Sequence, residues 1–264
     1  MALEFCSFAS GSSGNSYLVR SDKTSVIIDA GISCKRIEEG LACCGNRIEE
    51  ISAVLITHEH SDHVKSLRTV ARKAELARVY ATRGTWSSVD WAVHEEKRRV
   101  IASGERFRVG DIEVVPIRLS HDANEPVGYS LIHGGQQVSI LTDTGMVDER
   151  IFENIYDSDL IAIESNFDEQ MLQYGSYPWY LKQRIKGDEG HLSNDAAAAT
   201  VARLLDESDK PRKILLAHLS RENNFPEMAY ETVRNHLADC GHFLADCLKL
   251  DILHRDAISP LYRL

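Results

Sequence analysis

Four side chains that could bind a metal ion follow a short apolar segment near residue 55. The segment 53–56, Ala-Val-Leu-Ile, is rich in β-branched residues and predicts a strand buried on both faces. The ligand-type residues that follow are His58, His60, Asp62 and His63. Because alternate residues of an extended chain lie on one side, the first three are expected to point together, with His63 turning in as the strand ends. Imidazole and carboxylate ligands suit Zn²⁺ and related ions, so a metal site is favoured over a solvated turn.

The same pattern recurs along the chain. Four further predicted strands end in residues of metal-ligand or carboxylate type, which are His121, Asp143, Glu164 and His218. Any single case would be weak evidence, because strands often end in polar turns. Their recurrence predicts one shared site at the edge of a sheet sandwich.

The motif His58-x-His60-x-Asp62-His63 after an apolar strand resembles the signature of the metallo-β-lactamase superfamily, and the resemblance extends over nearly the whole chain. It is closest to the YycJ/WalJ (VicX) branch, whose members are described as metal-dependent 5′-3′ DNA exonucleases. The resemblance implies an α/β fold, an αββα four-layer sandwich, as a single domain over residues 1–264. At 264 residues with 43% apolar residues, one large core is also the default expectation.

The resemblance implies a site for two divalent metal ions. The matching ligands are His58, His60 and His121 for the first ion, Asp62, His63 and His218 for the second, and Asp143 bridging both. Ions bridged in this way lie ~3.5–4 Å apart and share a hydroxide, the expected nucleophile. Zn²⁺ is the first expectation, and Mn²⁺ and Fe accept the same ligand types. An aspartate at the place of Asp29 supports the metal loop in this superfamily rather than binding metal.

Within the superfamily, the bridging Asp143 resembles phosphodiesterases, glyoxalase II and RNase Z-like nucleases rather than β-lactamases. The choice among these depends on His191, which precedes Leu192-Ser193 and lies between Asp143 and His218 in sequence. RNase Z-like nucleases carry a histidine there that contacts the scissile phosphate, although a lone histidine before a helix is often a capping or surface residue. The predicted catalytic residues are Asp62, Glu164 and His191, with Glu164 orienting His191 or a ligand.

Two segments are candidates for holding a phosphate substrate. The loop 10–16, Ser-Gly-Ser-Ser-Gly-Asn-Ser, offers backbone N–H groups, and the residues expected to bind substrate are Ser12, Ser13, Gly14 and Asn15. An ordinary hairpin connection is the alternative. Lys182, Arg184 and Lys186 form a small basic cluster in a chain whose net charge is −10. Because most free-standing nucleic-acid binders are basic, a polyanion must be held here by such a local cluster and by metal.

Several elements are predicted between these motifs. Helices are expected over 33–43, 64–76, 85–93, 196–205 and 227–237, with Ser193-Asn194-Asp195 as the start of the fourth. Residues 243–253 are expected to supply a closing strand, and His94 is expected on the surface. The six cysteines form no CxxC pair, which favours reduced thiols in a cytoplasmic protein. The N-terminus lacks the pattern of a signal peptide, no apolar stretch approaches ~20 residues, and a homodimer is left open.

These features predict metal-dependent phosphodiester hydrolysis, with a 5′-3′ DNA exonuclease as the first hypothesis. A small-molecule or cyclic phosphodiesterase would need less basic surface, so the acidic chain keeps that alternative open. An RNase Z-like ribonuclease and a thiolester hydrolase are further alternatives within enzymes, and a metal-binding regulatory protein is the alternative outside them. The 75 positions from Asp143 to His218 leave no room for the inserted domain of β-CASP nucleases.

Overall fold

The computed structural model describes residues 2–244 and 248–264. The chain divides into two compact units. Unit 1 comprises the described residues up to 118 together with 123–138 and 254–264, and unit 2 comprises 119–122 and the described part of 139–253. The strands belong to two seven-stranded sheets, the first formed by β1 to β6 with β14, and the second by β7 to β13.

The first sheet lies within unit 1. Its strands are β1 (Glu4–Ala9), β2 (Ser16–Arg20), β3 (Ser25–Ile28), β4 (Ala53–Leu55), β5 (Arg78–Thr82), β6 (Arg98–Ile101) and β14 (Tyr262–Arg263), in the order β14-β1-β2-β3-β4-β5-β6. Pairing is antiparallel from β14 to β3 and parallel from β3 to β6. Ile28 of β3 is in register with Leu55 of β4, so the carboxyl ends of these two strands meet at one edge.

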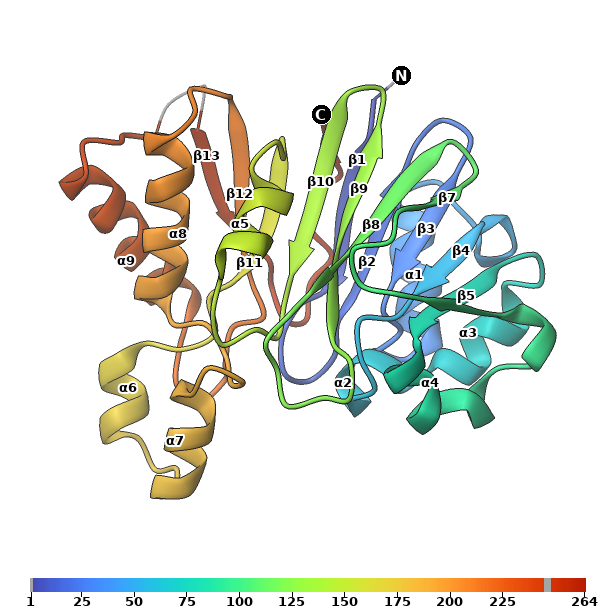
Figure 1. The fold of residues 1–264 in the computed structure, drawn as a ribbon, viewed down its shortest axis with the longest axis horizontal. Helices are drawn as coiled ribbons and strands as arrows, with labels where there is room; N and C mark the ends of the chain where they lie inside the picture. Colours follow the sequence, from blue (N-terminus) through green and yellow to red (C-terminus); the bar gives the residue numbers. More distant parts are fainter. Residues whose placement is uncertain (1, 245–247) are drawn as a thin grey trace. The chain divides into compact units, whose positions relative to one another are not determined.

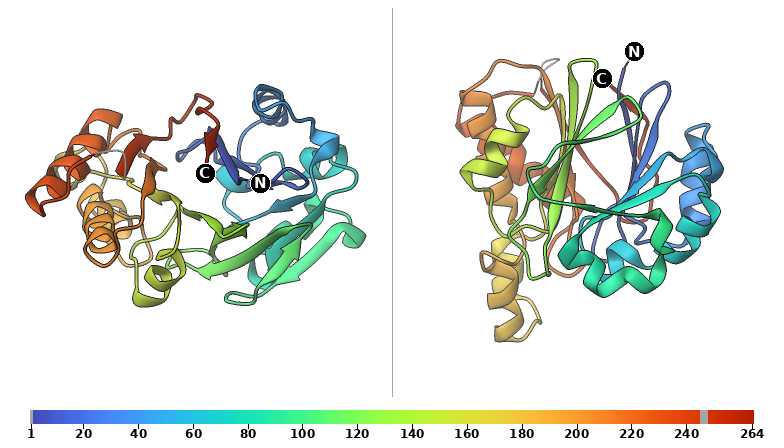
Figure 2. Two further views of the ribbon diagram at one scale, coloured as in Figure 1. Left: turned by 90° about the horizontal axis from the view of Figure 1, so that it is seen from above. Right: turned by 45° about the vertical axis from the view of Figure 1, so that its right-hand side comes forward.

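Helices cover one face of this sheet (Figure 2, right). They are α1 (Cys34–Cys43), α2 (Ser61–Val64), α3 (Leu67–Lys73) and α4 (Arg83–Val89), and short 3-10 turns lie at Ile48–Glu50, Asp90–Ala92 and Glu95–Lys97. Buried residues of the strands, such as Leu18 and Val54, form one apolar cluster with Leu41, Val70 and Trp86 from the helices. This packing fixes the segment between β4 and α3, which carries the histidine motif.

Three more strands of unit 1 form an antiparallel series. They are β7 (Phe107–Val109), β8 (Ile112–Arg118) and β9 (Val127–His133). The chain leaves unit 1 within β10 (Gln136–Leu141).

Unit 2 contains parallel strands and most of the longer helices. Its strands β11 (Leu160–Glu164), β12 (Arg212–Ala217) and β13 (Leu248–Ile252) are parallel neighbours, and its helices are α5 (Glu149–Ile155), α6 (Glu169–Tyr174), α7 (Trp179–Lys186), α8 (Asn194–Asp206) and α9 (Pro226–Asp239). Helices α8 and α9 pack against each other beside β12 and β13, whereas α6 and α7 form a separate helical pair (Figure 1). A small apolar cluster of Phe167, Leu172 and Ile185 holds that pair together.

One predicted helix is interrupted in the structure. The helix expected over 64–76 is interrupted, because Ser66 hydrogen-bonds through its backbone N–H and its hydroxyl to the Ala30 carbonyl and so ends α2 before α3 begins. The closing strand expected over 243–253 is present as β13, and residues 245–247 of that prediction lie outside the described residues. Within the described ranges, no helix has both the length and the apolar character needed to cross a membrane.

Candidate metal centre

Asp29 anchors the metal-ligand loop of unit 1. It follows β3 directly, is fully buried, and accepts hydrogen bonds from both the backbone N–H and the hydroxyl of Thr57, each at 2.9 Å. His63 Nδ1 lies 2.7 Å from the same carboxylate. Burial raises the pKa of Asp29 from its ordinary value, and the opposing interaction with His63 is the next cause. Asp29 therefore holds the loop in place through its contacts with Thr57 and His63.

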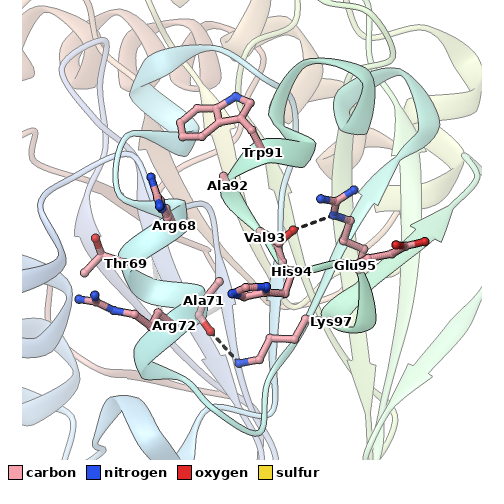
Figure 3. A pocket seen from close by; sticks show the side chains of 11 residues that line it. Arg68, Thr69, Ala71, Arg72, Trp91, Ala92, Val93, His94, Glu95 and Lys97 are labelled. Atoms are coloured by element: carbon pink, nitrogen blue, oxygen red, sulfur yellow. Dashed lines mark hydrogen bonds between the residues drawn. The ribbon is translucent and has the colours of Figure 1, made fainter.

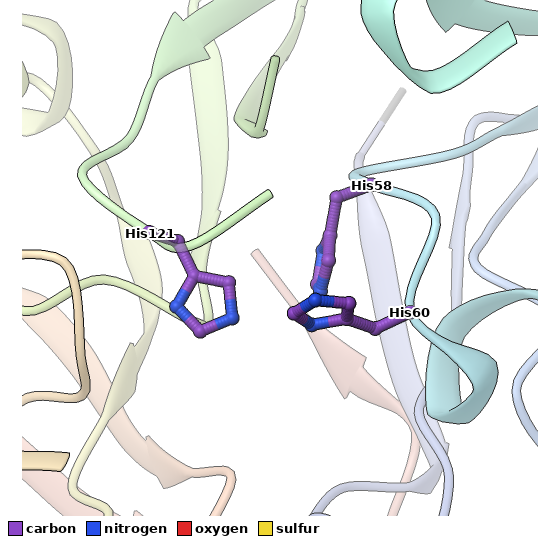
Figure 4. Close-up of side chains that lie close together, drawn as sticks. All are labelled: His58, His60 and His121. Carbon is purple, nitrogen blue, oxygen red and sulfur yellow. The ribbon is translucent and has the colours of Figure 1, made fainter. Parts of the chain in front are cut away.

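The histidines of the motif are held with one ring nitrogen committed. His58 Nδ1 lies 3.0 Å from the Thr57 hydroxyl, which itself donates to Asp29, so His58 Nδ1 is the donor. Nδ1 is thus the ring nitrogen that orients both His58 and His63, the arrangement seen when a carboxylate orients a metal-binding histidine. The ring of His58 lies 4.6 Å from that of His60, centroid to centroid, and 4.1 Å from that of His63. Figure 4 shows the imidazoles of His58 and His60 on their loop.

Asp62 reaches this group by a different route from the one predicted. Strand β4 ends at Leu55, and Asp62 lies in the first turn of the short helix α2 rather than on an extended chain. Its carboxylate Oδ2 lies 3.6 Å from His63 Nε2. A loop followed by a helical turn, and not the two-residue alternation of a strand, brings the two side chains together.

The glycine-rich loop fastens the motif to the sheet. The Asn15 backbone N–H donates to the Asp62 carbonyl at 2.8 Å, and the Asn15 side-chain nitrogen lies 3.0 Å from His63 Nε2. Gly31 packs on the same carbonyl so closely that an added Cβ would lie 1.6 Å from the Asp62 oxygen. Gly14 and Asn15 are buried, whereas Ser12 and Ser13 are exposed. The buried half of the loop thus has a structural role that its composition did not reveal.

Unit 2 gathers a second group of ligand-type side chains. Glu164 ends β11 and His218 follows β12, and because the two strands are parallel neighbours, their carboxyl ends meet at one edge. Asp143, Glu164, His191 and His218 form a group whose candidate ligand atoms all lie within 4.8 Å of one another. His218 Nδ1 lies 3.2 Å from Asp143 Oδ1 and 3.0 Å from Glu164 Oε1.

Glu164 contacts two histidines at once. Its Oε1 lies 2.8 Å from His191 Nδ1 and 3.0 Å from His218 Nδ1, while its Oε2 accepts from the Thr144 backbone N–H at 2.8 Å. Glu164 is fully buried, which raises a carboxyl pKa, but the two histidines outweigh burial and its pKa is lowered. Burial alone would lower the pKa of His191, but the negative charges of Glu164 and Asp143 outweigh burial, so the pKa of His191 is raised above its ordinary value.

His121 is fixed through its other ring nitrogen. Its Nδ1 donates to the Gly190 carbonyl at 2.9 Å, which leaves Nε2 directed elsewhere, 3.4 Å from the Asp122 carboxylate and 3.8 Å from that of Asp143. An added Cβ at Gly190 would lie 2.2 Å from the Ile185 carbonyl, so only glycine brings the backbone this close. Burial is the main cause that lowers the pKa of His121, which favours the neutral imidazole that metal ions bind.

Exposure separates His191 from His121 and His218, the other two candidate site histidines of unit 2. The His191 side chain is 19% exposed, whereas those of His121 and His218 are 1% exposed. It precedes α8, where the Ser193 hydroxyl accepts a hydrogen bond from the Ala196 N–H at 3.1 Å, which confirms the predicted helix start. A partly exposed imidazole at the start of a helix can contact a bound substrate.

Three site residues adopt a left-handed backbone. Asp29 (φ 61°), Asp143 (φ 63°) and His218 (φ 53°) are the non-glycine residues with positive φ in the part of the chain that the structure describes. Each follows the end of a strand. Such conformations are costly for residues with a Cβ and concentrate at functional sites.

Comparison with known proteins gives the family. A family model described as a beta-lactamase superfamily domain matches residues 24–219. Exodeoxyribonuclease YycJ of Bacillus anthracis is 36% identical over 253 residues, covering 95% of each chain. Exodeoxyribonuclease WalJ of Streptococcus pneumoniae serotype 2 is 36% identical over 266 residues, covering 99% of this chain and 98% of that protein.

The chain belongs to the beta-lactamase superfamily. Its likeness to YycJ and WalJ over nearly the full length confirms the predicted YycJ/WalJ-like branch. Among solved structures, the metallo-beta-lactamase fold protein YhfI of Bacillus subtilis matches all of this chain and all of its own with a TM-score of 0.75 at 13% identity. At that identity the likeness shows the fold alone, and with the two mixed sheets it confirms the predicted α/β metallo-β-lactamase fold.

The donor set of this superfamily member fits divalent metal ions. Neutral imidazoles and carboxylates are the ligands that Zn²⁺, Mn²⁺ and Fe share, and each unit gathers several of them with their remaining lone pairs oriented by hydrogen bonds. The clusters support binding of divalent metal, as predicted, while the identity and number of ions stay predictions.

The basic cluster predicted from the sequence is largely engaged. The Arg184 guanidinium pairs with Asp122, and Lys186 pairs with Glu169 at 2.9 Å. The Lys182 ammonium donates to the carbonyls of Gln173 and Gly175, at the end of α6. All three side chains lie on α7, so they form one cluster, but their charges are already partly compensated.

Sequence reasoning missed several residues that hold this superfamily site in place. Thr57 links Asp29 to His58, and Asn166 donates to the His218 carbonyl at 2.8 Å, which supports its left-handed turn. The Gly190 carbonyl orients His121. Thr57 precedes a ligand in sequence and Asn166 follows Glu164 by two residues, but their role depends on contacts that no spacing rule reveals.

Proposed function

We propose that this protein is a metal-dependent phosphodiester hydrolase that degrades DNA from the 5′ end. The observation that carries the proposal is the placement of His191, which is partly exposed and is held by Glu164 beside Asp143 and His218. The near full-length likeness to two proteins named exodeoxyribonucleases supports the choice of DNA.

We infer that the seven predicted ligands bind two ions. The proposed set is His58, His60 and His121 for one ion, Asp62, His63 and His218 for the other, and Asp143 shared. Bound divalent ions would polarise the phosphate and lower the pKa of a water molecule. The residues of the chain orient these ligands, because the carboxylates of Asp29 and Glu164 contact Nδ1 of His63 and of His218 and so fix the two rings.

His191 is proposed to contact the scissile phosphate. Its pKa is raised, so it carries a proton at a higher pH than an ordinary histidine, and Nδ1 is already committed to Glu164. Nε2–H is then the donor toward a phosphate oxygen or the leaving oxygen. In this scheme Asp62 acts as a ligand that also orients the attacking water, and Glu164 acts through His191 as a positioning residue.

Substrate contacts are proposed at two places. Ser12 and Ser13 are exposed at the tip of the glycine-rich loop and would meet a terminal phosphate, while Gly14 and Asn15 hold the loop in place. Lys182, Arg184 and Lys186 of α7 would contact the DNA backbone. A terminal phosphate bound in the loop would give a preference for 5′-phosphorylated ends.

A substrate panel tests this function. The purified protein, loaded in turn with Zn²⁺, Mn²⁺ and Fe²⁺, is assayed on DNA labelled at the 5′ or the 3′ end, on RNA, and on bis-p-nitrophenyl phosphate. We expect release of nucleotides from the 5′ end of DNA, faster with a 5′-phosphate than with a 5′-hydroxyl. Good cleavage of the small diester with every DNA and RNA left intact would replace the exonuclease with a small phosphodiesterase.

Cellular location and assembly are part of the same proposal. The described cysteines, Cys6, Cys34, Cys43, Cys44 and Cys240, carry free thiols, which is consistent with the proposed cytoplasmic location. Residues 1–264 are proposed to act as one domain, and a homodimer stays an open prediction that sedimentation at several protein concentrations would decide.

A further inference from the structure

A basic pocket lies on unit 1, formed by α3, the turns after α4 and the start of β6. Its volume is about 440 Å³, within the ~300–1,000 Å³ range of small-ligand pockets. The charged residues that line it are Arg68, Arg72, Lys97, Arg98 and Glu95. Four basic residues against one acidic residue give a local positive charge in a chain whose net charge is −10. None of these residues belongs to the candidate metal centre.

Two of the basic side chains build the wall of the pocket. Lys97 Nζ donates to the carbonyls of Ala71 and Ala74 at 2.7 and 3.0 Å, and so ties the end of α3 to the segment before β6. Arg98 Nε donates to the Val93 carbonyl at 2.8 Å (Figure 3). These contacts commit both residues largely to the protein itself.

The other two basic side chains are uncommitted. Arg68 and Arg72 lie four residues apart on α3, so both guanidinium groups stand on one face of the helix. Both residues are exposed, and neither guanidinium group forms a hydrogen bond or an ion pair with another described residue. Each of these guanidinium groups presents a planar fork of donors that matches phosphate oxygens.

An exposed indole completes the pocket. Trp91 is 69% exposed, and its ring nitrogen donates to the Ser88 carbonyl, which fixes the orientation of the ring. Below it, Ala92 and Val93 are buried and give an apolar floor (Figure 3). An oriented indole with a free face next to cationic groups is a platform on which a nucleobase stacks. A carboxylate ligand would use the arginines and leave this platform without a function.

We propose that this pocket binds one nucleotide of a DNA strand, with the base on Trp91 and the phosphate at Arg68 and Arg72. The nucleotide chemistry follows from the pocket itself, and the choice of a DNA strand as its source rests on the proposed function. The pocket would hold the substrate away from the reacting bond and so compensate for the repulsion between DNA and the acidic chain.

Binding to the metal-free protein tests the site without hydrolysis. Fluorescence anisotropy of a labelled oligothymidylate of about 12 nucleotides is measured over a range of salt concentrations. For Arg68→Gln/Arg72→Gln we expect at least ~10-fold weaker binding and a log-log salt slope smaller by about 0.7, since the two arginines share one phosphate and each single-strand phosphate contact contributes ~0.7. Arg78→Gln/Arg150→Gln removes the same charge from exposed arginines elsewhere and should change binding little.

The indole is tested by a matched pair of variants. Trp91→Ala should weaken binding by about 5- to 150-fold, the usual range for loss of one base–aromatic stack, whereas Trp91→Phe should retain most of it. The site is overturned if the arginine variant binds no worse than its control, or if Trp91→Ala binds like the wild type.

A competition experiment and a hydrolysis assay distinguish the remaining explanations. Competition by thymidine 5′-monophosphate as strong as that by the oligomer would overturn the strand as occupant and support a free nucleotide instead. All variants should hydrolyse bis-p-nitrophenyl phosphate at the wild-type rate. If the metal-loaded wild type cleaves no DNA while the metal-free protein binds the oligomer through Arg68, Arg72 and Trp91, the proposed function fails and the pocket stands.

Discussion

Asp29, Asp143 and His218 each hold a left-handed backbone that costs of order 1–3 kcal/mol for a residue with a Cβ. Hydrogen bonds nearby compensate part of that cost, since Asp29 receives two from Thr57 and the His218 carbonyl receives one from Asn166. All three positions were identified from the sequence by residue type. The left-handed backbone at these positions was not predicted, because the presence of an Asp or a His in a sequence does not indicate a positive φ.

His191 is expected to act on the substrate rather than on the metal. His191→Ala should keep the metal content of the wild type, because its Nδ1 is bound to Glu164 and its side chain is the most exposed of the three histidines of unit 2 that we describe. Turnover on DNA should fall by ~10²–10⁴, the usual contribution of a general acid. Metal analysis and steady-state kinetics check this, and a fall in metal content would make His191 a ligand.

Glu164 is expected to hold the proton on His191. In the metal-free protein, NMR titration of labelled histidine should give His191 a pKa above the ordinary ~6.5, and Glu164→Gln should lower it. The pair should stabilise the metal-free fold most between ~4.3 and ~6.5, the unfolded pKa values of Glu and His. The contribution of Glu164 is lost as pH falls through its lowered pKa, and that of His191 as pH rises through its raised pKa. An unchanged His191 pKa in Glu164→Gln would exclude this coupling.

At the scale of elements, the site follows from parallel strand neighbours. The C-terminal ends of β3 and β4 bring Asp29 to Thr57, and those of β11 and β12 bring Glu164 to His218. The sequence predicted these ends because apolar runs stop abruptly at polar residues. It did not predict that α2 starts at Ser61 with His60 at the N-cap, so the expected alternation of His58, His60 and Asp62 was wrong for Asp62.

Gly31 tests how tightly the glycine-rich loop holds the ligands. Gly31→Ala places a methyl group against the Asp62 carbonyl and should displace the start of α2, with a loss of ~1–3 kcal/mol in unfolding free energy and weaker metal binding. Gly187→Ala is the control, because its methyl group would come no closer than 3.2 Å to the nearest described atom outside its chain neighbours, the Gln183 carbonyl oxygen. Denaturant unfolding and metal titration measure both effects, and equal behaviour of the two variants would refute the clamp.

Helix α7 provides the corresponding test for substrate binding. Neutralising Lys182, Arg184 and Lys186 together should weaken DNA binding and flatten its salt dependence by about one log-log unit for each phosphate that the variant no longer neutralises. Hydrolysis of bis-p-nitrophenyl phosphate should barely change. Glu169→Gln, which releases Lys186 from its ion pair, should act in the opposite direction. Unchanged DNA affinity in the triple variant would remove α7 from the proposed interface.

At the scale of the molecule, the net charge determines where DNA can bind. The net charge of −10 repels DNA, so binding has to come from local cations such as α7 and the pocket at Arg68 and Arg72. The basic cluster on α7 was visible in the sequence. The pocket was not, because nothing in the sequence shows that Arg68 and Arg72 line one pocket with Trp91.

The central proposal is that the protein binds two metal ions and that Asp143 is a ligand of both. Its most direct test is the metal content of Asp143→Ala, measured beside the wild type by mass spectrometry after dialysis, together with turnover on DNA. We predict about two equivalents in the wild type, the loss of at least one in the variant, and nearly complete loss of hydrolysis. Thermal stability should fall with the metal, because bound ions cross-link distant parts of the chain. Full metal content and normal turnover in Asp143→Ala would contradict the account.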